Sequence, residues 1–395
     1  MSLSLLLTDG TGLTSRQVAT QAAAAGHTVD VLAPTRLGPA SFTRHVRRVH
    51  RVPAFGRDPE AWLEACVRVL AAGRYDVLLP TQEQVAILAR DAVRVDAGLA
   101  VPSFDALRRV QDKVAQARTL AELGIPHPET VVVTSPEVPF ELPAYVKAPI
   151  GTASAGVVRA ETRAELRAAA EAFLRDADAV VLQRPVDGPL VMAQAVFDRG
   201  RLVAWHANVR DREGAGGGSS AKRSLPLPAI RDALDRLGTA LRWHGALSFD
   251  AIARNGTVPE FAVIDVNPRL VEPGNAWRAG VDLVGALIAV SRGETVEVAP
   301  SPTPGVRTHQ LLLAVLGARD RRSVGRELLG ALTRLGPYAG SAEELTPARG
   351  DPLALVPVMA AAAATLVTPR ASAWFTGGAT AAYALTPGAW RTIAG

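Results

Sequence analysis

Two aspartates in neighbouring strand-like stretches are placed to meet across a hairpin. Asp250 and Asp265 flank an Asn255-Gly256 turn signal, and a loop centred near residues 257 and 258 would set them directly opposite each other. Their Cβ atoms would then be roughly 5 Å apart. Two carboxylates at that separation repel unless a cation lies between them, and Asn267 offers a further oxygen ligand. The pattern predicts a site for a hard divalent cation, and the alternative is a hairpin whose charges face water.

The second strand adds a guanidinium to this site. With a period of two, one face would carry Phe261, Val263, Asp265, Asn267 and Arg269. The other face would carry the apolar residues between them, Ala262, Ile264, Val266 and Pro268. Acid, amide and guanidinium on one strand face indicate that these positions serve a chemical role.

Length and composition bound the class of protein. At 395 residues with 48% hydrophobic residues, the chain predicts two or three domains with ample core. The single cysteine, Cys66, excludes an internal disulfide framework and suits a reducing compartment, so we expect a cytoplasmic protein without a signal peptide. The longest apolar run, Leu353 to Val367, is too short for a transmembrane segment and predicts a buried helix. A net charge of +5, spread along the chain with few aromatics nearby, gives no indication of nucleic-acid binding.

The lysines are unusually informative. Among 43 basic residues only Lys113, Lys147 and Lys222 are lysines, so arginine fills nearly every place where either cation would serve. The surviving lysines favour positions that need a compact ammonium on a flexible stem. Chance survival is the alternative for any one of them.

The first hundred residues read as an open parallel α/β unit. Residues 3 to 7 predict a buried strand, followed by a helix from about Ser15 to Ala25 and a strand from Thr28 to Leu32. The Asp9 to Thr14 turn has two glycines of a dinucleotide loop but no acid at the end of the second strand. We interpret these glycines as turn residues, with a nicotinamide-dependent dehydrogenase as a distant alternative.

Thr81 and Glu83 follow a strand, where α/β sheets bind ligands, although they could equally cap a helix.

A second set of motifs starts at Asp112-Lys113, which opens a helix. A proline-stiffened link, Ile125 to Thr130, leads into strands, and the second of these ends on Lys147. The following loop, Ala148 to Val157, consists of small residues whose backbone amides can approach phosphate oxygens, with Thr152 and Ser154 as extra donors.

The order of these motifs resembles the ATP-grasp superfamily, specifically its carboxylate–amine ligases and their carbamoyl-phosphate-synthase-like relatives. Asp-Lys before a helix, Gly-Ile-Pro-x-Pro-x-Thr, Val-Lys-Ala-Pro with its small-residue loop, Val-Leu-Gln with a Gly turn, and Asp-x-Asn-Pro-Arg follow one another over about residues 1 to 295. The resemblance implies an α/β and α+β fold, with a Rossmann-like domain over residues 1–102. It also implies a two-lobed ATP-grasp domain over 103–298, with the small lobe at about 126–184.

The resemblance also implies roles for individual residues. Lys113 and Lys147 would contact ATP phosphates, and Arg269 would reach a phosphate or the acyl-phosphate intermediate. The metal ligands would be Asp250, Asp265 and Asn267, holding Mg²⁺ or possibly Mn²⁺. The remaining nucleotide contacts would come from the phosphate loop and the interlobe hinge: Gly151, Thr152, Ser154, Gly156, Gln183, Arg184 and Val186.

The chain departs from the family pattern at three places. Asp265 stands where glutamate is common, Arg184 stands where the hinge often has glutamate, and Leu190 replaces an acid after the hinge glycine. A longer segment, Leu270 to Asn275, replaces the short Gly-Ser turn of relatives and bears on substrate specificity.

Two regions remain less defined. The Arg210 to Arg223 stretch is rich in glycine and cations, and we interpret it as a flexible loop facing substrate, with Arg210 and Lys222 as catalytic candidates that contact a carboxylate or phosphate. A disordered surface loop is the alternative. Residues 299–395, after a proline-rich link, predict a mainly helical region whose role the sequence does not name, although packing is favoured over a dimer surface or membrane contact.

Together these patterns predict an ATP- and Mg²⁺-dependent ligase that joins a small-molecule carboxylate, such as an amino acid, to an amine. A homodimer is possible. The alternative is an ATP-binding regulatory protein or assembly subunit without ligase activity.

Overall fold

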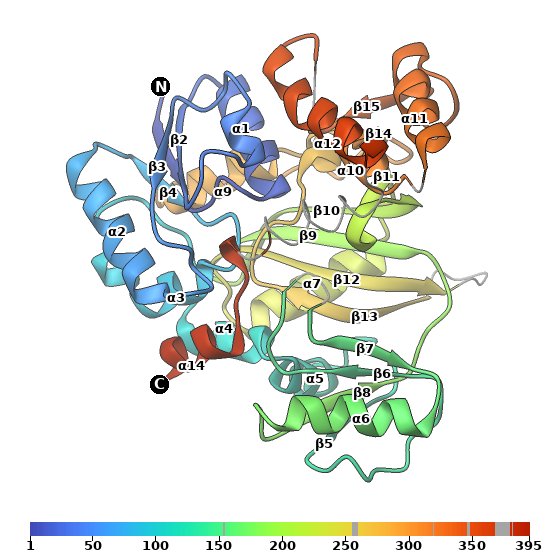
Figure 1. The fold of residues 1–395 in the computed structure, drawn as a ribbon. Helices are drawn as coiled ribbons and strands as arrows, with labels where there is room; N and C mark the ends of the chain where they lie inside the picture. Colours follow the sequence, from blue (N-terminus) through green and yellow to red (C-terminus); the bar gives the residue numbers. More distant parts are fainter. Residues whose placement is uncertain (153–154, 255–259, 319, 346–347, 368–379, 381) are drawn as a thin grey trace.

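The computed structural model describes residues 1–152, 155–254, 260–318, 320–345, 348–367, 380 and 382–395. Ser154 and the Asn255-Gly256 turn signal lie outside the described residues. Three sheets organise the chain, and helices pack on each of them (Figure 1). The expected α/β and α+β fold class is confirmed.

The N-terminal sheet has four parallel strands in the order β3-β2-β1-β4. Its central strand β1 is buried because parallel strands are covered on both faces, which explains the unbroken Leu5 to Leu7 run. The elements are β1 (Ser4–Leu7), α1 (Leu13–Ala24), β2 (Thr28–Ala33), β3 (Arg48–Arg51), α2 (Pro59–Ala72), β4 (Val77–Leu79), α3 (Val85–Arg90) and α4 (Phe104–Gln111).

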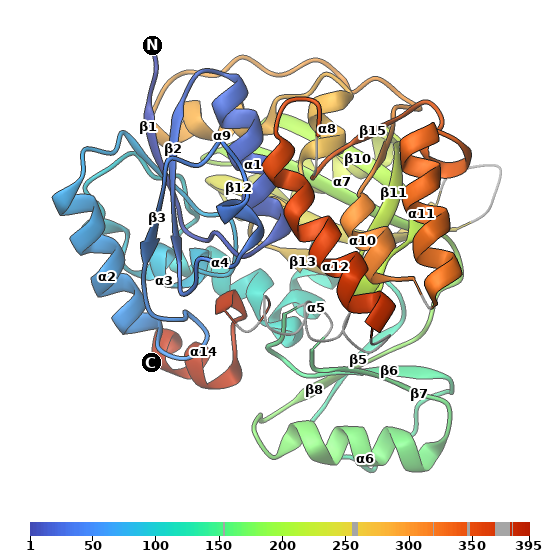
Figure 2. The same cartoon turned by 45° about the horizontal axis from the view of Figure 1, so that its top comes forward.

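The small sheet is antiparallel, in the order β5-β8-β6-β7, and it stands apart from the N-terminal sheet in both views (Figures 1 and 2). Helix α6 covers one face, and its start is fixed by a capping box in which Thr162 and Glu165 satisfy each other's backbone amides. The elements are α5 (Lys113–Glu122), β5 (Thr130–Val133), β6 (Ala144–Lys147), β7 (Val157–Ala160), α6 (Arg163–Leu174) and β8 (Val180–Gln183).

The large sheet has seven strands in the order β13-β12-β9-β10-β11-β14-β15. Helix α7 packs on one face, while α9 lies between the opposite face and the N-terminal sheet, so one apolar core joins the two sheets. The elements are β9 (Leu190–Asp198), β10 (Arg201–Glu213), β11 (Ser219–Ser224), α7 (Pro228–Ala240), β12 (Gly245–Arg254), β13 (Glu260–Asn267), α8 (Gly274–Arg278) and α9 (Leu283–Ser291).

The C-terminal residues are mainly helical but also complete the large sheet. Strands β14 (Arg307–His309) and β15 (Ser341–Glu343) extend it, and α10 (Leu311–Leu316), α11 (Arg321–Thr333) and α12 (Leu355–Val367) pack beside them. The last helix, α14 (Pro387–Ala394), returns to α2 and α3 (Figure 1). The favoured packing role therefore fits these contacts.

Strand β13 differs from the expected alternation. Asp265 pairs with Asp250, but Val263 pairs with Ala251, so Ile264 is an extra residue that forms a β-bulge. Phe261 and Val263 consequently share the α7-side core with Val266, whereas Asp265 alternates to the opposite face. The prediction that Phe261, Val263 and Asp265 share one face is wrong, because the bulge shifts the period by one residue.

Two other expectations need correction. The Arg210 to Arg223 stretch is not a flexible loop: its ends belong to β10 and β11, and only a short turn with the 3₁₀ segment Ala215–Gly217 separates them. The buried helix expected near residues 353–367 exists, but it buries only one face and leaves Met359 57% exposed. After β13, α8 and α9 are separate helices because Gly280 adopts a left-handed φ of 87° between them.

None of the helices in the described part of the chain has both the length and the apolar character that crossing a membrane requires.

The C-terminal region is tied to the N-terminal sheet by a buried ion pair. Arg16 of α1 donates to Asp351 at 2.8 Å, and both side chains are almost fully buried. Thr43 also donates to this carboxylate. A buried guanidinium that loses its partner is left uncompensated, which is costly.

We therefore expect Asp351→Ala to lower the free energy of unfolding by about 3–5 kcal/mol. Replacing both charges, as in Arg16→Met/Asp351→Leu, should recover part of this loss because no buried charge remains unpaired. Urea denaturation measures both effects, with Asp105→Ala, at an exposed position on α4, as the control. An Asp351→Ala protein as stable as the control would contradict the buried pair.

Candidate active site

The two aspartates predicted to face each other do so. Asp250 on β12 and Asp265 on β13 are register partners in the antiparallel pair. Burial, and then the neighbouring Asp265 carboxylate, raise the pKa of Asp250 to about 7. The raised pKa means that the nearby positive charge does not fully offset burial and the repulsion between the two carboxylates.

Two lysines reach this pair from different elements. Lys113 opens α5, where the Asp112 side chain caps the helix, and its ammonium donates to Asp265 at 2.7 Å. Lys147 ends β6 of the small sheet and donates to Gln183 at 2.7 Å and to the Ile264 carbonyl at 2.8 Å. The bulge presents that carbonyl to Lys147, so it links the small sheet to the large one.

Burial dominates the chemistry of Lys147. It lowers the pKa of this lysine to about 8, although the Asp265 carboxylate opposes the shift. For Lys113 the balance differs: burial opposes charge, but Asp265 raises the pKa above its ordinary value. A small pocket between the two sheets is lined by both lysines together with Gln183 and Ile264.

The oxygen atoms near the pair suit a hard cation. Mg²⁺ prefers carboxylate and amide oxygens, and Asn267 lies two residues after Asp265 on the same strand, with no side-chain hydrogen bond to any described residue. Within the described ranges, no cluster of three or more His, Cys, Asp or Glu side chains is placed to hold a metal. Protein ligation would therefore rest on two carboxylates and one amide, and octahedral Mg²⁺ commonly keeps water and phosphate ligands beside so few groups.

The small-residue loop connects β6 to β7, as expected. A Cβ at Gly151 would lie 2.0 Å from the Ala155 carbonyl oxygen, and Gly156 has a left-handed φ of 80°. Both positions therefore require glycine. The Thr152 hydroxyl accepts a hydrogen bond from the Leu385 amide at 3.1 Å, so the C-terminal segment contacts this loop.

The three hinge candidates are placed differently. Gln183 is buried and lines the small pocket between the two sheets, which we call the interlobe pocket. Its side-chain oxygen accepts a hydrogen bond from Lys147. Arg184 is exposed on the other side of the strand, where it pairs with Glu129 and Glu141. Val186 is half-buried in the segment between β8 and β9. The structure thus brings the Gln183 side chain, but not the Arg184 guanidinium, to the pocket.

Arg269 is buried against the N-terminal region. Its guanidinium contacts Glu83 at 3.0 Å, and Glu83 also accepts from Gln111. Glu83 is not a helix cap, because α3 begins at Val85 after Gln84; its carboxylate instead holds Arg269 just beyond the end of β13. Tyr383, from the C-terminal segment, lies close enough for its pKa to be affected by Arg269.

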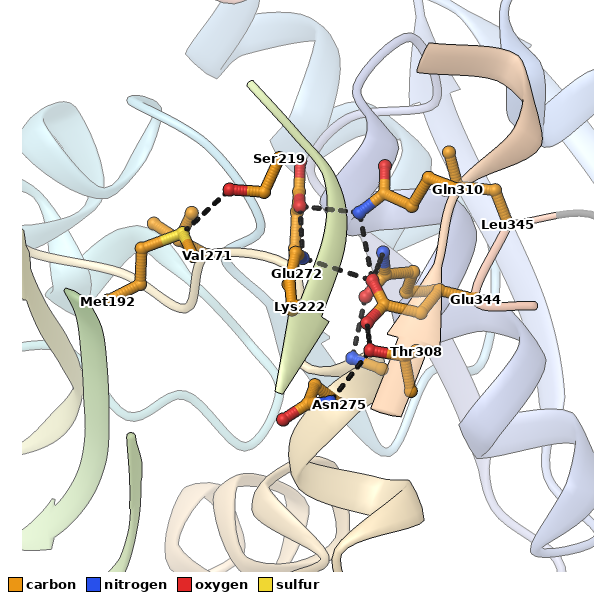
Figure 3. Close-up of polar contacts among 12 residues, drawn as sticks. Met192, Ser219, Lys222, Val271, Glu272, Asn275, Thr308, Gln310, Glu344 and Leu345 are labelled. Atoms are coloured by element: carbon orange, nitrogen blue, oxygen red, sulfur yellow. Dashed lines mark hydrogen bonds and ion pairs between the residues drawn. The ribbon is translucent and has the colours of Figure 1, made fainter. Parts of the chain in front are cut away.

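Lys222 is the centre of a buried polar network (Figure 3). Its ammonium contacts Glu272 at 2.5 Å and Glu344 at 3.0 Å, and only 2% of its side chain is exposed. Glu344 also accepts from Gln310 and Thr308. The Lys222 ammonium is therefore already paired with two protein carboxylates. It is not the exposed contact that the sequence suggested.

Arg210, the register partner of Lys222, behaves differently. It is one-quarter exposed, donates to the Gly217 carbonyl and pairs with Glu213. These contacts hold it at the turn that ends β10 and β11.

Sequence reasoning missed Glu272 and Glu344 as members of this network. Glu272 was only part of a departure from the family pattern, yet it adopts a left-handed φ of 52°, which is strained for a residue with a Cβ. Its carboxylate also influences the pKa of Asp250, which places the network beside the aspartate pair. No local signal identifies Glu344, because only the pairing of β14 with β15 brings it here.

Removing the ammonium should expose the repulsion between the two glutamates. We expect Lys222→Met to lower the free energy of unfolding by about 3–5 kcal/mol at neutral pH, since two buried carboxylates lose their shared cation. The deficit should shrink as pH rises through the folded-state pKa of Lys222, because the wild-type protein then loses this charge as well. Denaturation at several pH values measures this, and Lys222→Met/Glu344→Gln should be more stable than the single variant.

Titration of Lys222 itself sets the pH range of this effect. Burial opposes charge on Lys222, but Glu272 and Glu344 raise its pKa above the ordinary value. Its contribution is therefore fully present below pH about 10 and is lost as pH rises through the folded-state pKa. A Lys222→Met protein as stable as the wild type at neutral pH, or a deficit that does not shrink at alkaline pH, would contradict this interpretation.

Comparison with known proteins identifies the architecture. No protein-family model matches the sequence, and no curated protein matches it. Solved structures do match. N5-carboxyaminoimidazole synthetase from Staphylococcus aureus, complexed with ADP, has a TM-score of 0.61 at 14% identity, covering 84% of this chain and 86% of that one.

Two further structures agree. Carboxyaminoimidazole ribonucleotide synthase from Aspergillus clavatus, complexed with ATP, has a TM-score of 0.62 at 16% identity, covering 84% and 87% of the two chains. The biotin carboxylase domain of 2-oxoglutarate carboxylase from Hydrogenobacter thermophilus, with MgADP and bicarbonate, has a TM-score of 0.59 at 15% identity, covering 78% and 73%. The resemblance found in the sequence is thus confirmed for the architecture, and the chain has the ATP-grasp fold.

Proposed function

We propose that this protein is an ATP- and Mg²⁺-dependent ligase. It would activate a substrate carboxylate as an acyl phosphate and join it to an amine, releasing ADP and phosphate. The observation that carries the proposal is the convergence of Lys113, Lys147 and the facing aspartates between two sheets of an ATP-grasp fold. ADP, ATP and MgADP in the similar structures support the same chemistry.

Each group in the site would have a defined task. Asp250, Asp265 and Asn267 would hold Mg²⁺, which supplies charge neutralisation at the phosphates when bound. Lys147 and Lys113 would bind phosphoryl oxygens, and the backbone amides around Gly151 would cover them. Positioning and electrostatic stabilisation account for most of the catalysis in phosphoryl transfer, so no protein nucleophile is needed.

The reaction balances in two steps. A carboxylate oxygen attacks the γ-phosphorus of ATP, the bond to the β–γ bridging oxygen breaks, and ADP leaves. The amine then attacks the acyl carbon, phosphate leaves, and the amine loses a proton as the amide forms. Arg269, held by Glu83, lies at the end of β13 and would stabilise the acyl phosphate.

A phosphate-release screen identifies the substrates. Wild-type protein with ATP and Mg²⁺ would be tested against amino acids and small carboxylates, each with and without an amine. Phosphate release that requires both a carboxylate and an amine is the expected result. ATP binding without turnover across the whole panel would contradict the ligase and favour the regulatory alternative.

Asp265→Ala should reduce turnover by about 10²-fold or more while the protein stays folded. It removes the register partner of Asp250 and the acceptor of Lys113, but the side chain is about one-third exposed and contributes little to the core. The control is Asp178→Ala, an exposed acid in the small lobe, which should retain wild-type turnover. Equal turnover in both variants would refute the metal and phosphate roles of Asp265.

Nucleotide binding should depend on pH through Lys147. Because burial lowers the pKa of this lysine to about 8, free protein loses the proton above that pH, whereas bound phosphate favours the charged form. ATP affinity should therefore fall as pH rises through about 8, and binding should take up a proton there. Calorimetry in two buffers of different ionisation enthalpy measures the uptake, and Lys147→Gln should abolish it. Unchanged uptake in that variant would assign the proton to another group.

A further inference from the structure

A second positively charged cavity lies on the N-terminal sheet. It has a volume of about 610 Å³ and opens between the edge strand β3 and helix α2. Both elements lie on the opposite side of the molecule from the small sheet in the two views (Figures 1 and 2). Four arginines line it from two sides and define what we call the arginine cavity: Arg48 and Arg51 from β3, Arg68 from α2 and Arg74 just after α2.

These four arginines gather around one cavity without a carboxylate partner among the described residues. All four are exposed, and none forms an ion pair or a side-chain hydrogen bond with any residue that the structure describes. By contrast, Arg90 and Arg94 are each paired with a carboxylate of α2. Unpaired like charges around one cavity repel each other, and an anion between them would relieve that repulsion.

The floor of the cavity cannot supply the missing negative charge. Asp30 is buried on β2, and its carboxylate accepts two hydrogen bonds from Arg47 at 2.9 Å and one from the Tyr75 hydroxyl at 2.7 Å. His50 lies at 3.2 Å from the same carboxylate. With five lining arginines and this one aspartate, the formal charge around the cavity is +4 when His50 is neutral.

Protection of a sheet edge explains only part of this arrangement. Charged residues on an edge strand prevent pairing with another chain, which would account for Arg48 and Arg51. It does not account for Arg68 and Arg74, which approach the same cavity from the helix side. A second open cavity, of about 530 Å³, shares Arg51 and adds Arg36, so the positive lining continues past the end of β2.

Size and charge together select a ligand class. The volume lies within the range of about 300–1,000 Å³ that is typical of small-molecule sites. Planar guanidinium groups bind phosphate oxygens in bidentate fashion, and several of them suit several phosphoryl groups. We propose that the arginine cavity binds a small molecule carrying two or more phosphoryl groups, at a site separate from the interlobe pocket.

Direct titration tests this proposal with inorganic tripolyphosphate as the probe. The full-length Lys147→Gln protein is used, so that phosphate binding at the interlobe pocket is weakened. We expect tripolyphosphate to bind at an ionic strength of about 0.15 M. Inorganic monophosphate should bind at least about tenfold more weakly, because it engages fewer guanidinium groups.

Paired variants locate the site. Adding Arg51→Ala/Arg74→Ala should weaken tripolyphosphate binding by about tenfold or more. The matched control, Arg175→Ala/Arg322→Ala, removes two exposed arginines that lie outside the arginine cavity and form no ion pair with described residues. It should change the affinity for tripolyphosphate by less than about twofold. Thermal denaturation confirms that both proteins are folded.

Three outcomes would overturn the proposal. The first is the absence of tripolyphosphate binding to Lys147→Gln protein, and the second is equal affinity in the two paired variants. The third is tight binding of a short RNA that tripolyphosphate cannot displace, which would assign the surface to nucleic acid. None of these outcomes depends on ligase activity, so failure here is distinguishable from failure of the proposed function.

Discussion

The antiparallel register of β12 against β13 is the constraint on which the candidate site depends. It sets Asp250 opposite Asp265. The pKa of Asp250 rises because its carboxyl group is buried and lies close to the Asp265 carboxylate. Lys113 offsets part of this repulsion by bonding to Asp265. The bulge at Ile264 turns Asp265 away from the α7-side core and offers a carbonyl to Lys147. This single β-bulge therefore orients the Asp265 carboxylate and connects the large sheet to the small sheet.

The same face of the large sheet carries a second charge cluster, in which Lys222 and Glu344 are fully buried and Glu272 is mostly buried. Lys222, Glu272 and Glu344 come from β11, the segment after β13, and the end of β15. Gln17 of α1 also donates to Glu344, so the N-terminal region contributes to the network. Such a cluster costs desolvation energy that its hydrogen bonds must offset, and it fixes how the C-terminal region meets the rest of the molecule. Together with the Arg16–Asp351 pair, it explains why residues after 299 are part of this structure rather than an appendage.

The two positively charged sites differ in the burial and the pairing of their cationic side chains. In the interlobe pocket, lysines are buried and satisfied by an acid, an amide oxygen or a backbone carbonyl, so their charge is already directed. In the arginine cavity, guanidinium groups are exposed and unpaired among the described residues, above an Asp30 carboxylate that is already saturated. A lysine ammonium is a compact point charge, whereas planar guanidinium groups match phosphate oxygens in bidentate fashion.

The sequence alone determined the elements and their order. Helix α1 spans Leu13 to Ala24 and strand β2 spans Thr28 to Ala33, close to the predicted ranges, because apolar periodicity is a local signal. The Asp250–Asp265 pairing was predicted as well, but the pairs nearest the loop, such as Arg254 with Glu260, follow a register one residue different, and the bulge at Ile264 brings Asp265 opposite Asp250.

What the sequence did not determine was which face or partner a residue would take. A one-residue bulge reverses a strand face, a glycine at 280 divides a helix, and pairing across the sheet buries Lys222 between acids about 50 and 122 residues away. These outcomes depend on contacts between segments distant in sequence, for which period and composition carry no signal. The tertiary structure alone therefore decided how the charged groups are shared.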